Sequence, residues 1–141
     1  MINIKQELEV AKRASEIAAA LLIDNKDNIN KILSNEGRDV KLKADLESEK
    51  VIKEYLLANS NFPILAEESG ANQDLGNSFW VVDPLDGTSN YSRDFPICCI
   101  SIALIHENEI TLGVINDFNR GSLYEGSIDS RAKLNGADIF V

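Results

Sequence analysis

Acidic residues follow two apolar segments of the chain, and their types and spacing suit metal binding. Asp83 and Asp86 come directly after the apolar run 79–82, and Glu67 follows the apolar run 64–66. We expect these carboxylates to meet at the ends of core strands, where uncompensated negative charge is costly. A hard divalent cation removes that cost, and Mg²⁺ prefers oxygen ligands. The pattern therefore indicates a magnesium site.

The sequence Gly87-Thr88-Ser89 follows the second aspartate at once. Glycine lets the backbone approach a ligand closely, and free N–H groups at the start of a helix bind anions. Carboxylates for a metal beside amides for an anion indicate metal-assisted hydrolysis of a phosphate ester. The simpler alternative is that Asp83 and Asp86 stabilise a turn and that Glu67-Glu68 is a solvated acidic pair.

Composition narrows the class of protein. The 141 residues include 14 basic and 23 acidic side chains, for a net charge of -9. Such a surface repels a phosphate backbone, so we expect no binding to nucleic acid or to a membrane. The longest apolar run, 97–105, is too short to span a bilayer. The only cysteines, Cys98 and Cys99, are adjacent and suit a reducing environment. We therefore expect a cytoplasmic protein.

The pattern of apolar residues predicts the elements that position the acidic groups. Period-three-and-four spacing predicts a helix over residues 3–23 and a second helix over 45–58, with Asp45 at its N-terminal cap. The polar stretch 24–43 between them is expected to be a mobile loop. Period-two alternation predicts strands in the remainder, and Asn135-Gly136 is typical of a hairpin turn. We predict a single α+β domain over residues 1–141, with two N-terminal helices packed on an antiparallel sheet.

Several motifs resemble those of the inositol monophosphatase family, which comprises Mg²⁺-dependent, lithium-sensitive phosphatases. They are Asp83-Pro84-Leu85-Asp86-Gly87-Thr88, the preceding Phe79-Trp80-Val81-Val82 and Ala66-Glu67-Glu68-Ser69, and Lys43-Ala44-Asp45. The continuation Thr88-Ser89-Asn90-Tyr91 with Phe95-Pro96 is similar to the inositol monophosphatases themselves. The 3′(2′),5′-bisphosphate nucleotidases of the same superfamily carry lysine and glutamate after the threonine, so they are the alternative that Ser89-Asn90 disfavours.

The resemblance implies roles for the matching residues. One Mg²⁺ would be held by Glu67, Asp83 and the carbonyl of Leu85, and a second by Asp83 and Asp86. Glu67 and Thr88 would activate the attacking water, with Asp45 orienting the Thr88 hydroxyl. Phosphate would be bound at Gly87, Thr88 and Ser89, and the substrate would be inositol phosphate or a similar small phosphate monoester.

Family members run to nearly twice this length, and a Trp-Asp motif in their second half completes the second metal site. The only tryptophan here, Trp80, precedes Asp83 and Asp86. We therefore expect the chain to correspond to the N-terminal half of the family's αβαβα sandwich, with the C-terminal half absent and the second Mg²⁺ held weakly. An alternative is a truncated, non-catalytic remnant that binds metal, phosphate or a partner chain. In either case we expect a homo-oligomer or association with the missing C-terminal half.

Overall fold

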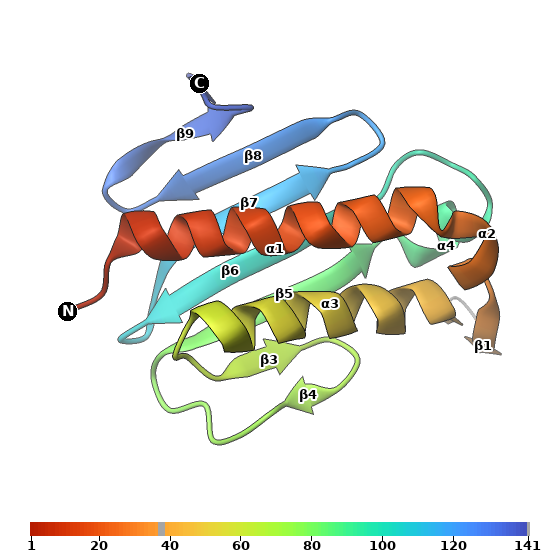
Figure 1. Ribbon diagram of the computed structural model, residues 1–141, viewed down its shortest axis with the longest axis horizontal. Helices are drawn as coiled ribbons and strands as arrows, with labels where there is room; N and C mark the ends of the chain where they lie inside the picture. Colours follow the sequence, from red (N-terminus) through yellow and green to blue (C-terminus); the bar gives the residue numbers. More distant parts are fainter. Residues whose placement is uncertain (37–38, 141) are drawn as a thin grey trace.

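A computed structural model describes residues 1–36 and 39–140, in which helices cover one side of an eight-stranded sheet (Figure 1). The helices are α1 (Ile4–Asp24), α2 (Lys26–Ile29), α3 (Lys43–Asn59) and α4 (Thr88–Ser92). The strands are β1 (Ile32–Glu36), β2 (Asp39–Leu42), β3 (Ile64–Ala66), β4 (Gly70–Ala71), β5 (Phe79–Asp86), β6 (Cys99–His106), β7 (Glu109–Asp117), β8 (Ser122–Ser127), β9 (Ser130–Leu134) and β10 (Ala137–Asp138). This architecture confirms the predicted α+β class.

The large sheet has the strand order β10-β9-β8-β7-β6-β5-β3-β4. Neighbours from β5 to β10 pair antiparallel, as predicted, but β3 pairs parallel to β5 with Ala66 opposite Val82. The parallel pair arises because β4 returns the chain to the end of the sheet at which β3 began. Both strands therefore end at the same edge, which brings Glu67 beside Asp83.

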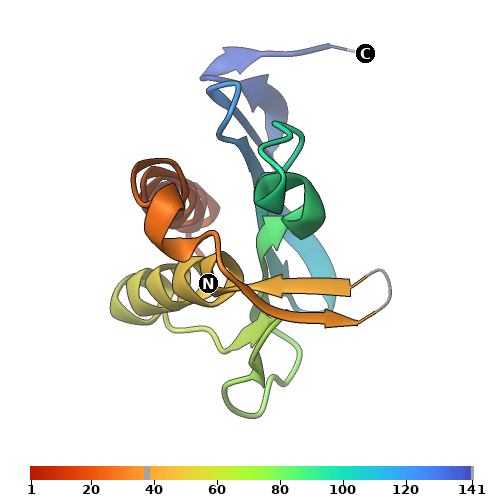
Figure 2. The ribbon, with the colours of Figure 1, turned by 90° about the vertical axis from the view of Figure 1, so that its right-hand side faces the viewer.

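The core lies between the sheet and the two long helices. Figure 2 shows α1 and α3 on the same side of the sheet, where α1 packs on β6, β7 and β8 and α3 packs on β5. Ala11, Ala14 and Ala18 of α1 are fully buried, because small side chains let the helix approach the strands closely. On β6 the large residues Ile100 and Ile102 face the helices, and the smaller residues that alternate with them face the other way.

The stretch 24–43 is not the irregular loop that its polar composition predicts. It contains α2 and an antiparallel hairpin of β1 and β2. Apolar alternation does not reveal this hairpin, because β1 belongs to a two-stranded ribbon and Ile32 and Leu33 are both exposed. Residues 37 and 38, within the predicted loop, lie outside the described residues. Among the described residues, no helix combines the length and the apolar character needed to cross a membrane.

Helix α3 begins two residues earlier than the sequence predicts. Leu42 occupies the N-cap position, so Asp45 is the third residue of the helix rather than its cap. The Asp45 carboxylate accepts the N–H of Leu42 at 2.7 Å and thus still satisfies one of the unpaired donors at the helix start.

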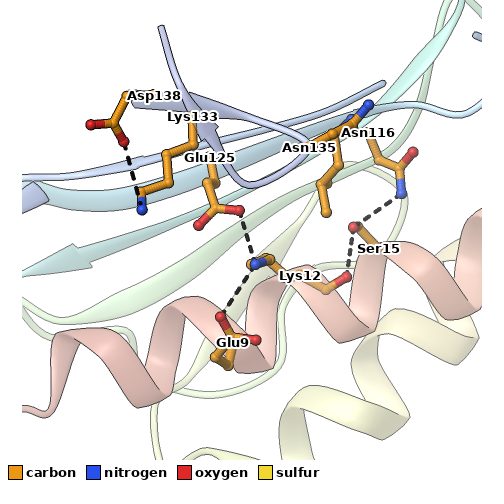
Figure 3. A network of polar contacts seen from close by, with 9 residues as sticks. Glu9, Lys12, Ser15, Asn116, Glu125, Lys133, Asn135 and Asp138 are labelled. Atoms are coloured by element: carbon orange, nitrogen blue, oxygen red, sulfur yellow. Dashed lines mark hydrogen bonds and ion pairs between the residues drawn. The ribbon is translucent and has the colours of Figure 1, made fainter. Parts of the chain in front are cut away.

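A partly buried ion pair joins α1 to the sheet (Figure 3). Lys12 Nζ lies 2.9 Å from Glu125 Oε2 and 3.2 Å from Glu9 Oε1, and the Lys12 and Glu125 side chains are 20% and 8% exposed. The Glu125 carboxylate, more than Glu9, holds the pKa of the Lys12 ammonium above its usual value. Nearby, the Asn116 amide donates to Ser15 Oγ at 3.3 Å. These contacts fix α1 across β7 and β8.

Replacing Lys12 by methionine leaves the Glu125 carboxylate buried without its partner. We expect Lys12→Met to lower the free energy of unfolding by about 3 kcal/mol in urea titrations. The double variant Lys12→Met with Glu125→Leu should recover most of that loss, since an apolar pair replaces the charges. Arg13→Met is the control, because the Arg13–Glu16 pair is exposed and should contribute less than about 0.5 kcal/mol. Equal losses in Lys12→Met and Arg13→Met would contradict this account.

Candidate active site

A β-bulge in β5 turns both aspartates to the same face of the sheet. Asp83 pairs with Ser101 and Asp86 pairs with Cys99, so three steps along β5 match two steps along β6. Directly opposite residues share a face of a sheet, whereas residues three apart on a regular strand point to opposite faces. The extra residue therefore places both carboxylates on the face that α1 and α3 leave uncovered.

The carboxyl groups of Glu67 and Asp83 are neighbours, because Ala66 and Val82 are partners in the ladder of β3 with β5. The N–H of Glu67 donates to the carbonyl of Val82 at 3.1 Å, which sets the end of β3 against β5. A hydrogen bond to the Asp83 carboxylate, followed by partial burial and the charge of Asp83, raises the pKa of Glu67 to about 8. Glu67 therefore carries a proton at neutral pH in the absence of a cation. That proton removes the repulsion that two neighbouring carboxylates would otherwise have.

Asp86 does not join this carboxyl pair. Among residues 1–36 and 39–140, no three His, Cys, Asp or Glu side chains are placed to hold one metal ion. The Glu67–Asp83 pair nevertheless fits a hard divalent cation, because Mg²⁺ is usually held by one or two carboxylates and several waters. Asp83 also accepts the N–H of Leu85 at 3.3 Å, so it has the turn-forming role as well.

Asp45 links the start of α3 to the turn after β5. Its Oδ1 accepts the Thr88 hydroxyl at 2.8 Å, while its Oδ2 accepts the N–H of Leu42. Burial raises the pKa of Asp45, and the two hydrogen bonds oppose that rise. The carbonyl oxygen of Leu85 lies 3.1 Å from the same Thr88 hydroxyl. Three of the residues singled out from the sequence, Asp45, Leu85 and Thr88, are therefore in one network.

Two further residues of α3 hold the same region, although no motif in the sequence assigns them a role there. Ser48 Oγ donates to the carbonyl of Pro84 at 2.7 Å. Glu49 Oε1 accepts the N–H of Glu68 at 2.8 Å. Both side chains are buried. Only their spacing relative to Asp45, at three and four residues, indicates that they share its face of the helix.

Gly87 is required by both its conformation and its surroundings. Its φ of +91° lies in the left-handed region, and a Cβ at this position would meet the Ile97 carbonyl oxygen at 2.8 Å. Gly87 is the N-cap of α4, so Thr88 and Ser89 are the first residues of that helix. The first N–H groups of a helix have no partners within it, which makes this turn suited to an anion.

A cavity opens beside Asp86 and Gly87 on the uncovered face. It is lined by Asp86, Gly87, Cys99, Asp117, Arg120 and Tyr124, among others. Asp117 Oδ2 lies 3.4 Å from an Arg120 nitrogen, and Asp117 Oδ1 is buried without a hydrogen-bond partner in the described part of the chain. Neither Asp117 nor Arg120 could be identified from the sequence, because no local pattern indicates that the end of β7 lies next to the end of β5.

Paired carboxyl groups beside a glycine turn, on an α+β fold, are chemically suited to metal-assisted hydrolysis of a phosphate ester. The chain belongs to the inositol monophosphatase family, whose sequence pattern matches residues 3–141. This confirms the family that the sequence motifs suggested.

Individual relatives cover the chain almost completely. It is 38% identical to the Nus factor SuhB of Xylella fastidiosa, over 97% of the chain and 50% of that protein. It is 34% identical to the inositol-1-monophosphatase of Synechocystis, over 99% of the chain and 50% of that protein. The structure of the inositol monophosphatase from Anabaena superposes with a TM-score of 0.84 at 31% identity, over 99% of this chain and 51% of that one. The chain thus spans about half the length of the relatives it matches.

The Glu67–Asp83 contact predicts that metal binding releases a proton. A cation requires both groups to be ionised, and the pKa of Glu67 is about 8 without it. We expect Mg²⁺ binding at pH 7 to release about one proton, and apparent affinity to rise up to about tenfold per pH unit until it levels off above pH 8. Titration calorimetry in buffers of different ionisation enthalpy measures this release. Affinity that does not change between pH 6 and pH 9 would refute the prediction.

Proposed function

We propose that this chain forms the metal- and phosphate-binding part of an Mg²⁺-dependent phosphomonoesterase that acts on inositol phosphate or a similar small phosphate monoester. The observation that carries the proposal is the Glu67–Asp83 carboxyl contact, on the same face as the turn at Gly87. Membership of the inositol monophosphatase family supports it. Bound Mg²⁺ would stabilise negative charge on the ester and lower the pKa of a coordinated water.

The proposed metal ligands are the side chains of Glu67, Asp83 and Asp86 and the carbonyl of Leu85. Asp83 is the residue shared by two ions in this proposal. Its place at the bulge, between Glu67 on β3 and Asp86 at the end of β5, supports that role. The relatives extend well beyond the matched region, so the remaining ligands of the second ion would come from another polypeptide segment.

Water activation is proposed for Glu67 and Thr88. Because the Thr88 hydroxyl donates its proton to Asp45 at 2.8 Å, its oxygen is free to accept a hydrogen bond from a water molecule. Asp45 thereby fixes the direction in which Thr88 accepts. The attacking water would be held between Thr88 and Glu67 and would enter in line with the departing alcohol.

The phosphate group is proposed to bind the amides at Gly87, Thr88 and Ser89. The departing alcohol would then lie in the cavity beside Asp86, where the unpartnered Asp117 Oδ1 is an acceptor for a hydroxyl and Arg120 is a donor. These groups favour a small alcohol with several hydroxyls. The free thiols of Cys98 and Cys99 support the proposal of a reducing, cytoplasmic location.

The assay that tests this function uses the chain tagged in its own cells and purified with any polypeptide that accompanies it. We expect Mg²⁺-dependent hydrolysis of inositol phosphate, and Asp83→Asn should reduce it about a thousandfold, because a charge that stabilises the transition state is lost. Asp138→Asn, which changes an exposed aspartate on β10, is the matched control.

Each outcome of this assay separates the alternatives. Unchanged turnover in Asp83→Asn would discard the mechanism. Faster hydrolysis of adenosine 3′,5′-bisphosphate than of inositol phosphate would identify the bisphosphate nucleotidase alternative. Absence of hydrolysis together with Mg²⁺ binding would favour the non-catalytic alternative.

We also propose that the uncovered face of the sheet binds a second polypeptide, either another copy of this chain or a segment corresponding to the second half of its relatives. The helices lie on the other side of the sheet (Figure 2), and the cavity-lining residues Ile115 and Ile139 on this face are 46% and 40% exposed. Apolar surface of this kind is typical of an interface.

Light scattering after gel filtration tests this association. The chain should form a dimer or a heteromeric complex, and Ile115→Lys should dissociate it, because a charge would be buried in the interface. Leu57→Lys is the control, since Leu57 is 55% exposed on α3, on the opposite side. A monomer at every concentration, with cooperative unfolding, would contradict the proposal.

A further inference from the structure

Lys41 forms an ion pair with Glu68, the residue that follows the proposed metal ligand Glu67. It lies on β2, and its Nζ is 2.8 Å from Glu68 Oε2. The Lys41 side chain is 48% exposed, whereas the Glu68 side chain is 9% exposed. Glu68 directly follows Glu67 in the chain, so the ammonium pairs with the immediate neighbour of a proposed metal ligand. Figure 2 shows the hairpin of β1 and β2 running past the end of the sheet toward its uncovered side.

The surroundings of Lys41 are otherwise acidic. Glu68 first, and then the charges of Asp45 and Glu49, hold the pKa of Lys41 above its usual value, so the side chain is cationic at neutral pH. Asp45 and Glu49 are buried. A buried carboxylate is strongly destabilised when no opposite charge or donor is near, so one ammonium compensates several acids here.

Lys41 also attaches the β1–β2 hairpin to the segment that follows β3. Glu49 accepts the N–H of Glu68, which fixes the segment after β3 against α3. The ion pair then joins β2 to that same segment. Charge compensation and attachment of the hairpin predict different effects on metal binding, and an experiment can separate them.

We propose that Lys41 is a resident counter-ion of the carboxylate site, which weakens the binding of divalent cations and strengthens the binding of the phosphate group. The proposal rests on the proposed function. A fixed positive charge close to a metal site repels the metal, and it attracts the oxyanion that binds beside that metal. Lys41 is thus a positioning and charge-balancing residue, with no part in bond making.

The test measures Mg²⁺ and inorganic phosphate affinities by titration calorimetry. Removing one positive charge from the neighbourhood of a divalent ion, with a water-like dielectric constant, should change the affinity for that ion about fivefold. Lys41→Met should therefore bind Mg²⁺ about fivefold more tightly, and the Mg²⁺-loaded protein should bind phosphate more weakly. Both differences should shrink at high salt.

Matched variants isolate the charge. Lys41→Arg keeps the charge and should behave as the unaltered chain. Lys133→Met removes an equally charged side chain, 38% exposed, that pairs with Asp138 on β10 at the far edge of the sheet, and it should change neither affinity. Glu68→Gln should weaken Mg²⁺ binding, and combining it with Lys41→Met should return the affinity close to the original value.

The direction in which Lys41→Met changes Mg²⁺ affinity decides between charge compensation and simple attachment of the hairpin. If Lys41→Met weakens Mg²⁺ binding or leaves it unchanged, Lys41 only attaches the hairpin, and the proposal is overturned. Asp83→Asn distinguishes this failure from failure of the proposed function. If Asp83→Asn still binds Mg²⁺ as tightly as the unaltered chain, the metal site itself is wrongly identified, whatever Lys41→Met shows.

Discussion

The buried carboxylate of Asp45 is the interaction on which the candidate site depends. It accepts hydrogen bonds from the Leu42 N–H and from the Thr88 hydroxyl. Thr88 lies 43 residues further along the chain than Asp45. Each donor helps to keep the carboxylate ionised despite its burial. Helix α3, strand β2 and the turn after β5 are therefore fixed relative to one another by a single side chain. Ser48, one turn further along α3, adds a contact to Pro84.

Much of the fold could be predicted because it follows from local pattern. The apolar spacing of α1 and the alternation along β6 reflect one buried face each, which is the information that periodicity carries. The hairpin at Asn135-Gly136 was predictable for a similar reason, since both residues adopt positive φ, at 49° and 83°. The β1–β2 hairpin was not predicted, because Ile32 and Leu33 of β1 are both exposed and no alternation marks that strand. That the chain forms a single domain remains a prediction.

In the candidate site, too, the residues within local motifs were predictable and the contacts between distant segments were not. Gly87 and Thr88 were found from a motif, and the structure shows why glycine is required there. The proximity of Glu67 to Asp83 depends on the parallel pairing of β3 with β5, which no local pattern encodes. The bulge that gives Asp83 and Asp86 a common face was likewise invisible, although proline in that segment is consistent with an interrupted ladder. Glu49 and Lys41 were missed because their partners are distant in sequence.

The two strands at the edges of the large sheet, β4 and β10, have two residues each. Strands this short offer few free backbone groups to an incoming strand, which is a common means of preventing edge-to-edge aggregation. Lateral extension of the sheet is thereby disfavoured at both rims. A polypeptide that joins this chain through the sheet is therefore expected to stack on its broad surface, and the same stacking would shield the carboxylates from solvent.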